Sequence, residues 1–280
     1  MQPLCHYRDA DLYFHHSIDR HPEETAFPMH LHEQLEIYCY MAGEASYLVE
    51  GTEYALTPGS LLIMRPAESH KVRILSDVPY ERYALHFSPV WLDGIDPDRL
   101  LLEPFYAHPL GQNNLYAPAD FPAGMHLTLL QAMCAPAASE AERRLTILTH
   151  LYPLLEAIRR ASCCKRLPAA PPASERLPES IIAYINRHLF EDLSLTSLSE
   201  KAFLSVSQFS RLFKNATGSS VWQYILIKRL LAAKDAIKSG VPAADASQAC
   251  GFHDYSSFYR AYKRYFGHSP QQDGPAKSVL

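Results

Sequence analysis

The spacing of apolar residues changes along this chain, and the first part has the two-residue repeat of β-strands. Between about residues 27 and 90, short runs alternate between apolar and polar positions. In residues 35–41, Glu36, Tyr38 and Tyr40 fall on one face and the apolar residues fall on the other. Turn signals separate the runs, with Gly51-Thr52 as a tight hairpin and Pro58-Gly59 as a second turn. Further runs at 61–64 and 83–87 complete the pattern, which predicts a β-sandwich or barrel.

A helical period follows at residues 124–134 and 140–160. Five apolar residues of the second segment form one stripe: Leu145, Leu148, Leu151, Leu155 and Ile158. Such a stripe suits packing on the barrel or a dimer interface, and the pattern leaves both interpretations open. Pro153 within the stripe predicts a kink or a break. We therefore expect a barrel domain at 1–120 and a helical segment, with dimerisation as one role, at 121–162.

A stretch rich in proline and small residues, 161–174, separates these helices from the rest of the chain. Proline has no backbone N–H to donate, so we expect an interdomain linker at 163–177. Beyond it every segment is helical, and glycines at 218, 240 and 267 close several helices. The expected helices are 178–189, 194–203, 205–216, 219–239, 242–250 and 255–266.

Two of these helices are near copies of each other. The sequence SQFSRLFKNATG at 207–218 returns 49 residues later as SSFYRAYKRYFG at 256–267. Aromatic residues four apart share a helix face and must pack inward, namely Phe209 with Phe213 and Phe258 with Tyr262. The outward positions are polar or basic: Ser207, Ser210, Arg211 and Lys214 in the first copy, and Ser256, Tyr259, Arg260 and Lys263 in the second.

The spacing of the copies suits double-stranded DNA. Each copy starts after a capping residue, Ser205 or Asp254, and follows another short helix, which predicts two helix-turn-helix units. The helix at 219–239 between them would span about 31 Å. Major grooves on one side of DNA recur every ~34 Å. Residues 175–280 carry 13 basic and 9 acidic side chains, a net charge of +4, against −8 for residues 1–174.

Residues from about 178 to 272 resemble the DNA-binding domain of the AraC-type (AraC/XylS) family of bacterial transcription regulators. The matching stretches include Phe209-Ser210-Arg211-Leu212-Phe213-Lys214, Thr217-Gly218, Arg229-Leu230, Gly251-Phe252 and Phe266-Gly267-His268-Ser269-Pro270. The resemblance implies base contacts chiefly from Ser207, Ser210, Arg211, Ser256, Tyr259 and Arg260, with Gln208, Lys214, Tyr255 and Lys263 beside them. In the second unit Ala243 and Ala246 replace the bulkier apolar pair usual in the family, so we expect the smaller contribution from Arg260.

The front domain carries candidate binding residues. His30, His32, Glu36, Tyr38 and Tyr40 are all even-numbered, so one extended run projects them to the same face. The spacing from His30 to Gly43 resembles the first cupin motif, and Pro58-Gly59 with His70 resembles the second. The resemblance implies a cupin- or jelly-roll-like barrel with these residues inside it. A sugar-like polar effector is the favoured ligand; a metal held by His30, His32, Glu36 and His70 is the less favoured one.

Composition limits the function classes. No apolar run approaches the ~18 residues of a membrane span, and the first residues show no secretory signal. The six cysteines have no disulfide or zinc spacing, which fits the cytoplasm. We expect an α+β protein: a cytoplasmic, homodimeric transcription regulator, not an enzyme, without a cofactor. Its partners would be DNA, a small effector and RNA polymerase, and the resemblance favours activation. A metal-dependent cupin enzyme and a regulator controlled by a protein partner are the alternatives.

Overall fold

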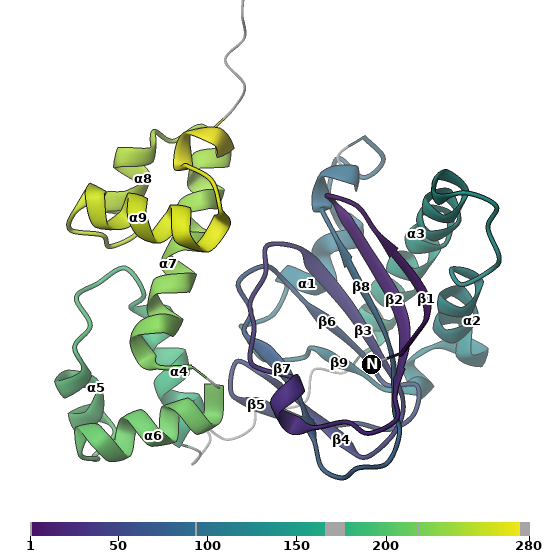
Figure 1. The fold of residues 1–280 in the computed structure, drawn as a ribbon, viewed down its shortest axis with the longest axis horizontal. Coiled ribbons are helices and arrows are strands. Elements are labelled where there is room, and N and C mark those ends of the chain that lie inside the picture. The colour runs from purple at the N-terminus through teal and green to yellow at the C-terminus, as the bar shows by residue number, and fades with distance from the viewer. Residues whose placement is uncertain (1, 93, 166–176, 218, 275–280) are drawn as a thin grey trace, which may run out of the picture. The chain divides into compact units, whose positions relative to one another are not determined.

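The computed structural model describes residues 2–92, 94–165, 177–217 and 219–274. The chain divides into two compact units, residues 1–171 and 172–280, which are described separately (Figure 1). None of the described helices combines the length and apolar character needed to cross a membrane.

Two antiparallel sheets form the N-terminal unit. The larger sheet has the strand order β1-β2-β8-β3-β6-β9, and the smaller has the order β5-β4-β7. The strands are β1 (Gln2–Arg8), β2 (Leu12–Asp19), β3 (Leu35–Ala42), β4 (Ala45–Val49), β5 (Thr52–Ala55), β6 (Leu61–Met64), β7 (His70–Ile74), β8 (Tyr80–Phe87) and β9 (Leu115–Tyr116). The predicted cupin-like β-domain is confirmed, and it begins with two strands, β1 and β2, that precede the predicted β-region.

Strand β3 is buried on both faces, which explains its alternating sequence. Leu35, Ile37 and Cys39 are fully buried in a core on the outer side of the larger sheet. Tyr38 and Tyr40 lie in a second core, where they meet residues of the smaller sheet. The predicted separation of the two faces is therefore correct, and both faces are removed from water.

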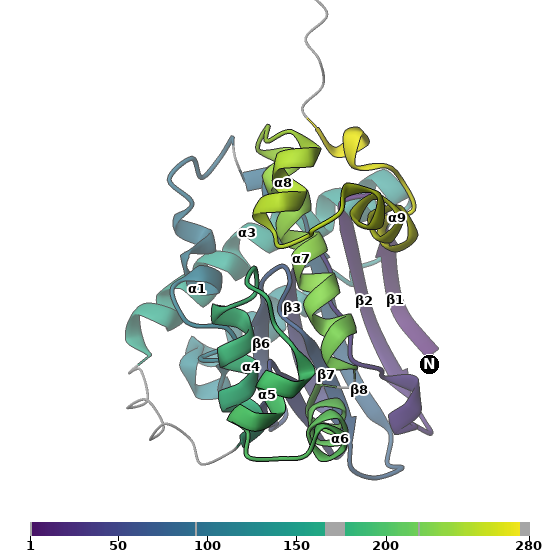
Figure 2. The same cartoon turned by 90° about the vertical axis from the view of Figure 1, so that its left-hand side faces the viewer.

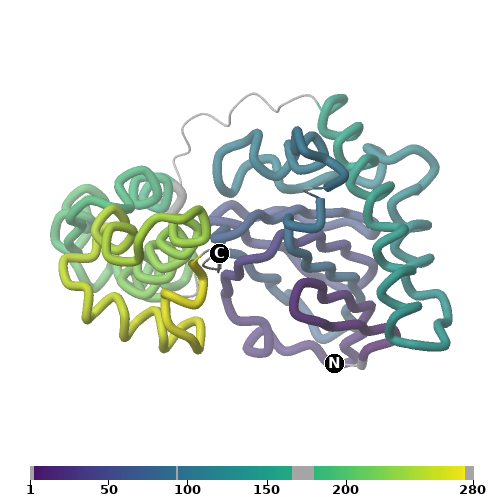
Figure 3. The backbone as a smooth tube through the Cα atoms, turned by 90° about the horizontal axis from the view of Figure 1, so that it is seen from above, coloured from purple at the N-terminus to yellow at the C-terminus, as the bar shows by residue number. Residues whose placement is uncertain are grey.

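Helices cover the outer face of the larger sheet (Figures 1 and 3). They are α1 (Glu103–Tyr106), α2 (Met125–Ala132) and the long α3 (Glu140–Cys164). Leu151, Leu155 and Ile158 of α3 are buried in the same core as β3, so this part of the stripe packs on the larger sheet. Leu145, by contrast, is 61% exposed. We predicted a kink or a break at Pro153; helix α3 continues through it, so there is no break.

The linker begins later than predicted. Helix α3 continues to Cys164, which places Cys163 and Cys164 on the helix rather than in the linker. Ala161 is buried on the same face as Ile158, and this packing extends the helix past the small residues at its end. After Cys164, the next proline in the sequence is Pro168. The remainder of the predicted linker, 166–176, lies outside the described residues.

The hairpin between β4 and β5 turns one residue earlier than predicted. Val49 pairs with Thr52, so the two turn residues are Glu50 and Gly51, not Gly51 and Thr52. Their φ angles are 49° and 86°. A turn with two positive φ angles matches the twist of the strands and disfavours the β-branched Thr52.

In the C-terminal unit, the described residues form helices and no strands, as predicted. It contains α4 (Leu177–Arg187), α5 (Leu195–Lys201), α6 (Val206–Thr217), α7 (Val221–Lys238), α8 (Ala243–Ala249), α9 (Tyr255–Phe266) and the short 3₁₀ helix η6 (Pro270–Asp273). Five further 3₁₀ helices belong to the N-terminal unit: η1 (Glu24–Ala26), η2 (Pro89–Leu92), η3 (Leu100–Leu102), η4 (Pro118–Asp120) and η5 (Pro122–Gly124).

Helix α7 connects two small cores. Its first half packs with α4, α5 and α6 around Phe209 and Phe213, and its second half packs with α8 and α9 around Phe258 and Tyr262. In both views α6 and α9 lie across α7, near its opposite ends (Figures 1 and 2). The helix has 18 residues, so it spans about 27 Å rather than the predicted 31 Å. It is shorter because Ser220 caps its start and Gly240, with φ 95°, follows its end.

Candidate functional site

Helix α6 presents the predicted polar face. Phe209 and Phe213 are at most 1% exposed, which fixes the orientation of the helix. Ser207, Arg211 and Lys214 are exposed and Ser210 is half-buried. Among the described residues, neither Arg211 nor Lys214 forms a hydrogen bond or ion pair within the chain, so both side chains can contact a partner. Exposed cationic and hydroxyl groups on one helix face are suited to phosphates and base edges.

Gln208 has a structural role in this arrangement. Its Oε1 accepts hydrogen bonds from the N–H of Ser205 at 3.2 Å and from the hydroxyl of Ser205 at 2.9 Å. The N–H of Gln208 donates to Ser205 Oγ at 3.3 Å. This reciprocal pair is a capping box, which satisfies backbone donors at the start of α6. Gln208 therefore caps the start of α6, and its side chain remains exposed.

Helix α9 presents the corresponding polar face in the second helix-turn-helix unit. Phe258 and Tyr262 are fully buried, whereas Ser256, Arg260 and Lys263 are exposed and Tyr255 and Tyr259 are half-buried. Asp254 caps the helix, as predicted, by accepting from the N–H groups of Ser256 and Ser257. Ala246 packs fully buried beneath the aromatic pair. The small residues of α8 thus contribute to a continuous core.

Arg229 joins the two helix-turn-helix units, a role that the sequence did not suggest. Its guanidinium donates to three backbone carbonyl oxygens: Leu189 at 2.8 Å, Glu191 at 2.7 Å and Gly251 at 2.6 Å. Leu189 and Glu191 follow α4 in the first unit, and Gly251 begins the turn before α9 in the second. Arg229 therefore ties the segment that follows α4 to the turn that precedes α9.

The second candidate site is a group of polar side chains in the N-terminal unit. His30, His32, Glu36 and His70 each bring one donor atom into the group, and these four atoms lie within 4.8 Å of one another. The Nε2 atoms of His32 and His70 are each 2.8 Å from Glu36 Oε2. Glu36 and His70 are buried, His32 is half-buried and His30 is exposed, so the group is reached from one side. We call these four residues the histidine–glutamate cluster.

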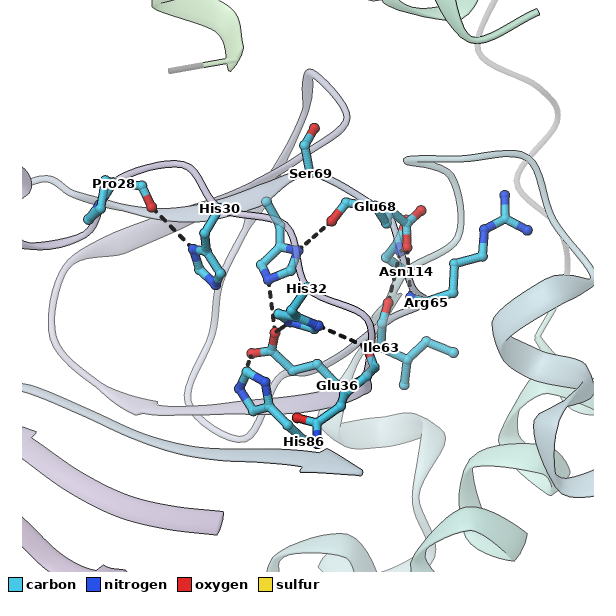
Figure 4. Close-up of polar contacts among 12 residues, drawn as sticks. Pro28, His30, His32, Glu36, Ile63, Arg65, Glu68, Ser69, His86 and Asn114 are labelled. Atoms are coloured by element: carbon cyan, nitrogen blue, oxygen red, sulfur yellow. Dashed lines mark hydrogen bonds and ion pairs between the residues drawn. The ribbon is translucent and has the colours of Figure 1, made fainter. Parts of the chain in front are cut away.

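His86 is a fifth member of this neighbourhood that sequence reasoning missed. Its Nε2 is 3.7 Å from Glu36 Oε1, and its ring faces that of His32 with a centroid distance of 4.6 Å (Figure 4). The register of β3 with β8 pairs Glu36 directly with His86. No sequence signal gives that register, because residues 36 and 86 belong to strands far apart in the chain.

The electrostatics of the cluster favour an ionised Glu36. Burial alone would raise the pKa of its carboxyl, but the imidazoles of His86 and His70 and the hydrogen bond from His32 hold that pKa well below its usual value. Burial lowers the pKa of His86 to about 4, despite the opposing effect of Glu36. The negative charge of Glu36 is thus buried and surrounded by imidazole nitrogen atoms.

The two tyrosines predicted for this site lie farther along β3. The hydroxyl of Tyr38 is hydrogen-bonded to that of Tyr80, and the hydroxyl of Tyr40 donates to the carbonyl of Gly43. Tyr40 lies four positions along the strand from Glu36, or about 13 Å. The structure therefore brings together His30, His32, Glu36 and His70, with Tyr38 beside them and Tyr40 at the far end of the strand.

Comparisons with known proteins divide the chain in the same way. Residues 198–273 match the family model described as a helix-turn-helix domain, and residues 17–155 match that described as an AraC-like ligand binding domain. The probable transcriptional regulator LumQ of Photobacterium leiognathi is 44% identical over 88 residues, which cover 31% of this chain and 36% of LumQ.

Two other relatives match over most of their length. The Msm operon regulatory protein of Streptococcus mutans is 22% identical over 279 residues, covering 97% of each chain. The HTH-type transcriptional activator RhaS of Yersinia pseudotuberculosis is 22% identical over 258 residues, covering 91% of this chain and 92% of the relative. Both units of the structure are therefore matched together, in the same order, by single regulators.

Proposed function

Since this chain belongs to the AraC-type family of bacterial transcription regulators, we propose that it binds specific DNA sequences under the control of a small polar effector. The observation that carries the DNA-reading part is the pair of exposed faces on α6 and α9, which lie on one compact unit. Arg211 and Arg260 would read bases, and Lys214 and Lys263 would contact phosphates.

The effector would bind at the histidine–glutamate cluster. A buried carboxylate with imidazoles around it supplies both acceptors and donors for hydroxyl groups, so a sugar or a related polyol is the favoured class. Binding would shift the protein between states of different DNA affinity. Activation of transcription is the favoured outcome because the RhaS relative is named as an activator.

The remaining partners follow from the same role. We infer a cytoplasmic homodimer that acts on RNA polymerase, with the exposed Leu145 of α3 as part of the dimer contact. A catalytic role is not favoured, because the relatives with the same two domains are named as regulators.

A titration of operator DNA in the presence of candidate effectors tests this proposal. One class of neutral polyols should change the affinity of the full chain for DNA at least about fivefold, the lower end of usual coupling between sites. The response should disappear in His32→Ala and persist in His21→Ala, whose exposed histidine lies outside the cluster. A response that survives in His32→Ala would place the effector elsewhere.

A further inference from the structure

Two cysteines that are far apart in the sequence meet in the N-terminal unit. Cys5 lies on β1, the edge strand of the larger sheet, and Cys134 lies in the turn that follows α2. Both side chains are half-buried, and both pack against the core between the larger sheet and its helices. The Cys134 thiol donates a hydrogen bond to the sulfur of Cys5. The fold thus places two oxidisable sulfur atoms beside each other, as a disulfide requires.

Arg143, near the start of α3, supports this pair of thiols. Its Nη1 donates to the carbonyl oxygens of Met133 at 3.3 Å and Ala135 at 2.5 Å, the residues on either side of Cys134. These hydrogen bonds hold the backbone at Cys134, while the positive charge of the guanidinium acts on the sulfur of Cys5. A cation beside a thiol favours its ionised form, the thiolate, which is the nucleophile.

The two sulfur atoms differ in their ionisation. The hydrogen bond from Cys134, assisted by the charge of Arg143, lowers the pKa of Cys5 to about 7, although burial opposes the change. The same hydrogen bond raises the pKa of Cys134, which therefore keeps its proton. Burial raises the pKa of Cys39, on β3, to about 12, so that thiol is unreactive. Cys5 is therefore suited to attack an oxidant, and Cys134 is suited to complete the disulfide.

We propose that Cys5 and Cys134 are a peroxide-reactive thiol pair that closes into a reversible disulfide. The Cys5 thiolate attacks one oxygen of the peroxide, the O–O bond breaks, and the other oxygen leaves as water after taking up a proton. The sulfur of Cys134 then attacks the resulting sulfenic acid, so that the S–S bond forms, the S–O bond breaks and a second water leaves. Two thiols are oxidised and one peroxide is reduced. The bond would join β1 to the connection between α2 and α3.

Oxidation of the full chain with one equivalent of hydrogen peroxide tests this proposal. Cys163→Ser and Cys164→Ser form the background, because these exposed thiols of α3 would otherwise react as well. The mass should fall by two hydrogen atoms, and proteolysis should release a peptide that joins Cys5 to Cys134. Dithiothreitol should reverse both changes. The oxidised chain should unfold at a higher temperature, because a cross-link between distant segments restricts the unfolded chain.

Three variants separate the roles of these residues. In Cys134→Ser the reaction should stop at the sulfenic acid of Cys5, which dimedone traps. Arg143→Met should slow formation of the disulfide at neutral pH at least about twofold, because less of Cys5 is then thiolate. The matched control is Arg144→Met, which removes the neighbouring cation of α3 that forms an ion pair with Asp9, and it should leave the rate unchanged.

The proposal is overturned if Cys5 and Cys134 remain thiols in peroxide, or if they are oxidised separately without a cross-link. A disulfide that forms as fast in urea as in the folded chain would also overturn it, since the fold would then contribute nothing to the pairing. None of these measurements involves DNA or an effector. Their failure therefore leaves the proposed DNA-binding function untouched, and a failure of DNA binding leaves the disulfide result intact.

Discussion

Arg229→Met should lower the free energy of unfolding of the C-terminal unit by at least about 3 kcal/mol. The guanidinium donates three hydrogen bonds, at 2.6 to 2.8 Å, to carbonyls that follow α4 or precede α9. Hydrogen bonds from charged groups contribute about 1.5–3 kcal/mol each. Water can replace the bond to Glu191, which is exposed, so the loss stays below the sum of the three. Methionine keeps the apolar stem but none of the donors.

Urea unfolding followed by tryptophan fluorescence measures this loss. The chain has two tryptophans, Trp91 in the N-terminal unit and Trp222 on α7 of the C-terminal unit. In a Trp91→Phe background, tryptophan fluorescence therefore reports on the C-terminal unit alone. Arg229→Lys, which keeps the charge but cannot reach three carbonyls at once, should be intermediate. DNA affinity should fall together with stability, because we expect the hydrogen bonds of Arg229 to set the separation of α6 and α9. An unchanged urea midpoint in Arg229→Met would refute this role of Arg229.

Arg211→Ala should weaken specific DNA binding by about 1–3 kcal/mol and relax the preference at one or two base pairs. The side chain is exposed on α6 beside Ser207, and among the described residues no partner within the chain competes for it. Arginine reads guanine through two parallel hydrogen bonds, which alanine cannot make. Binding measured on the preferred duplex and on each single-base variant separates loss of affinity from loss of specificity.

Two variants serve as comparisons for Arg211. Lys214→Ala should weaken binding equally on all duplexes and reduce the salt slope by about one, as loss of a phosphate contact does. Arg260→Ala should have a smaller effect than Arg211→Ala. If Arg211→Ala weakens binding to every duplex equally, Arg211 contacts phosphate and not a base. An equal or larger loss of affinity in Arg260→Ala would show that Arg260 does not contribute less to DNA binding than Arg211.

The sequence predicted those features that depend on local periodicity. The aromatic pairs four apart fixed the inward faces of α6 and α9, and the alternation at 35–41 fixed both faces of β3. The four residues of the cluster were also predicted, because two of them precede Glu36 by a few residues and His70 belongs to a recognisable motif. Boundaries were less accurate: α7 is shorter and α3 longer than expected.

Features that depend on contacts between distant segments were not predictable. His86 meets Glu36 only through the register of β3 with β8, and Arg229 meets Leu189 and Gly251 only through the packing of α7. The turn at Glu50 and Gly51 was misplaced because the alternation does not show which residues of β4 and β5 pair with each other. In each case the missing information is a pairing in space, which a single sequence does not contain.

Selection from random duplex DNA by the full chain shows whether α6 and α9 contact one duplex together. We expect enrichment of two short blocks centred about 10–10.5 base pairs apart, one for α6 and one for α9. Insertion of five base pairs between the blocks should then abolish tight binding, since it places them on opposite sides of the duplex. No enrichment, or one block whose binding tolerates the insertion, would show that α6 and α9 do not bind one duplex together.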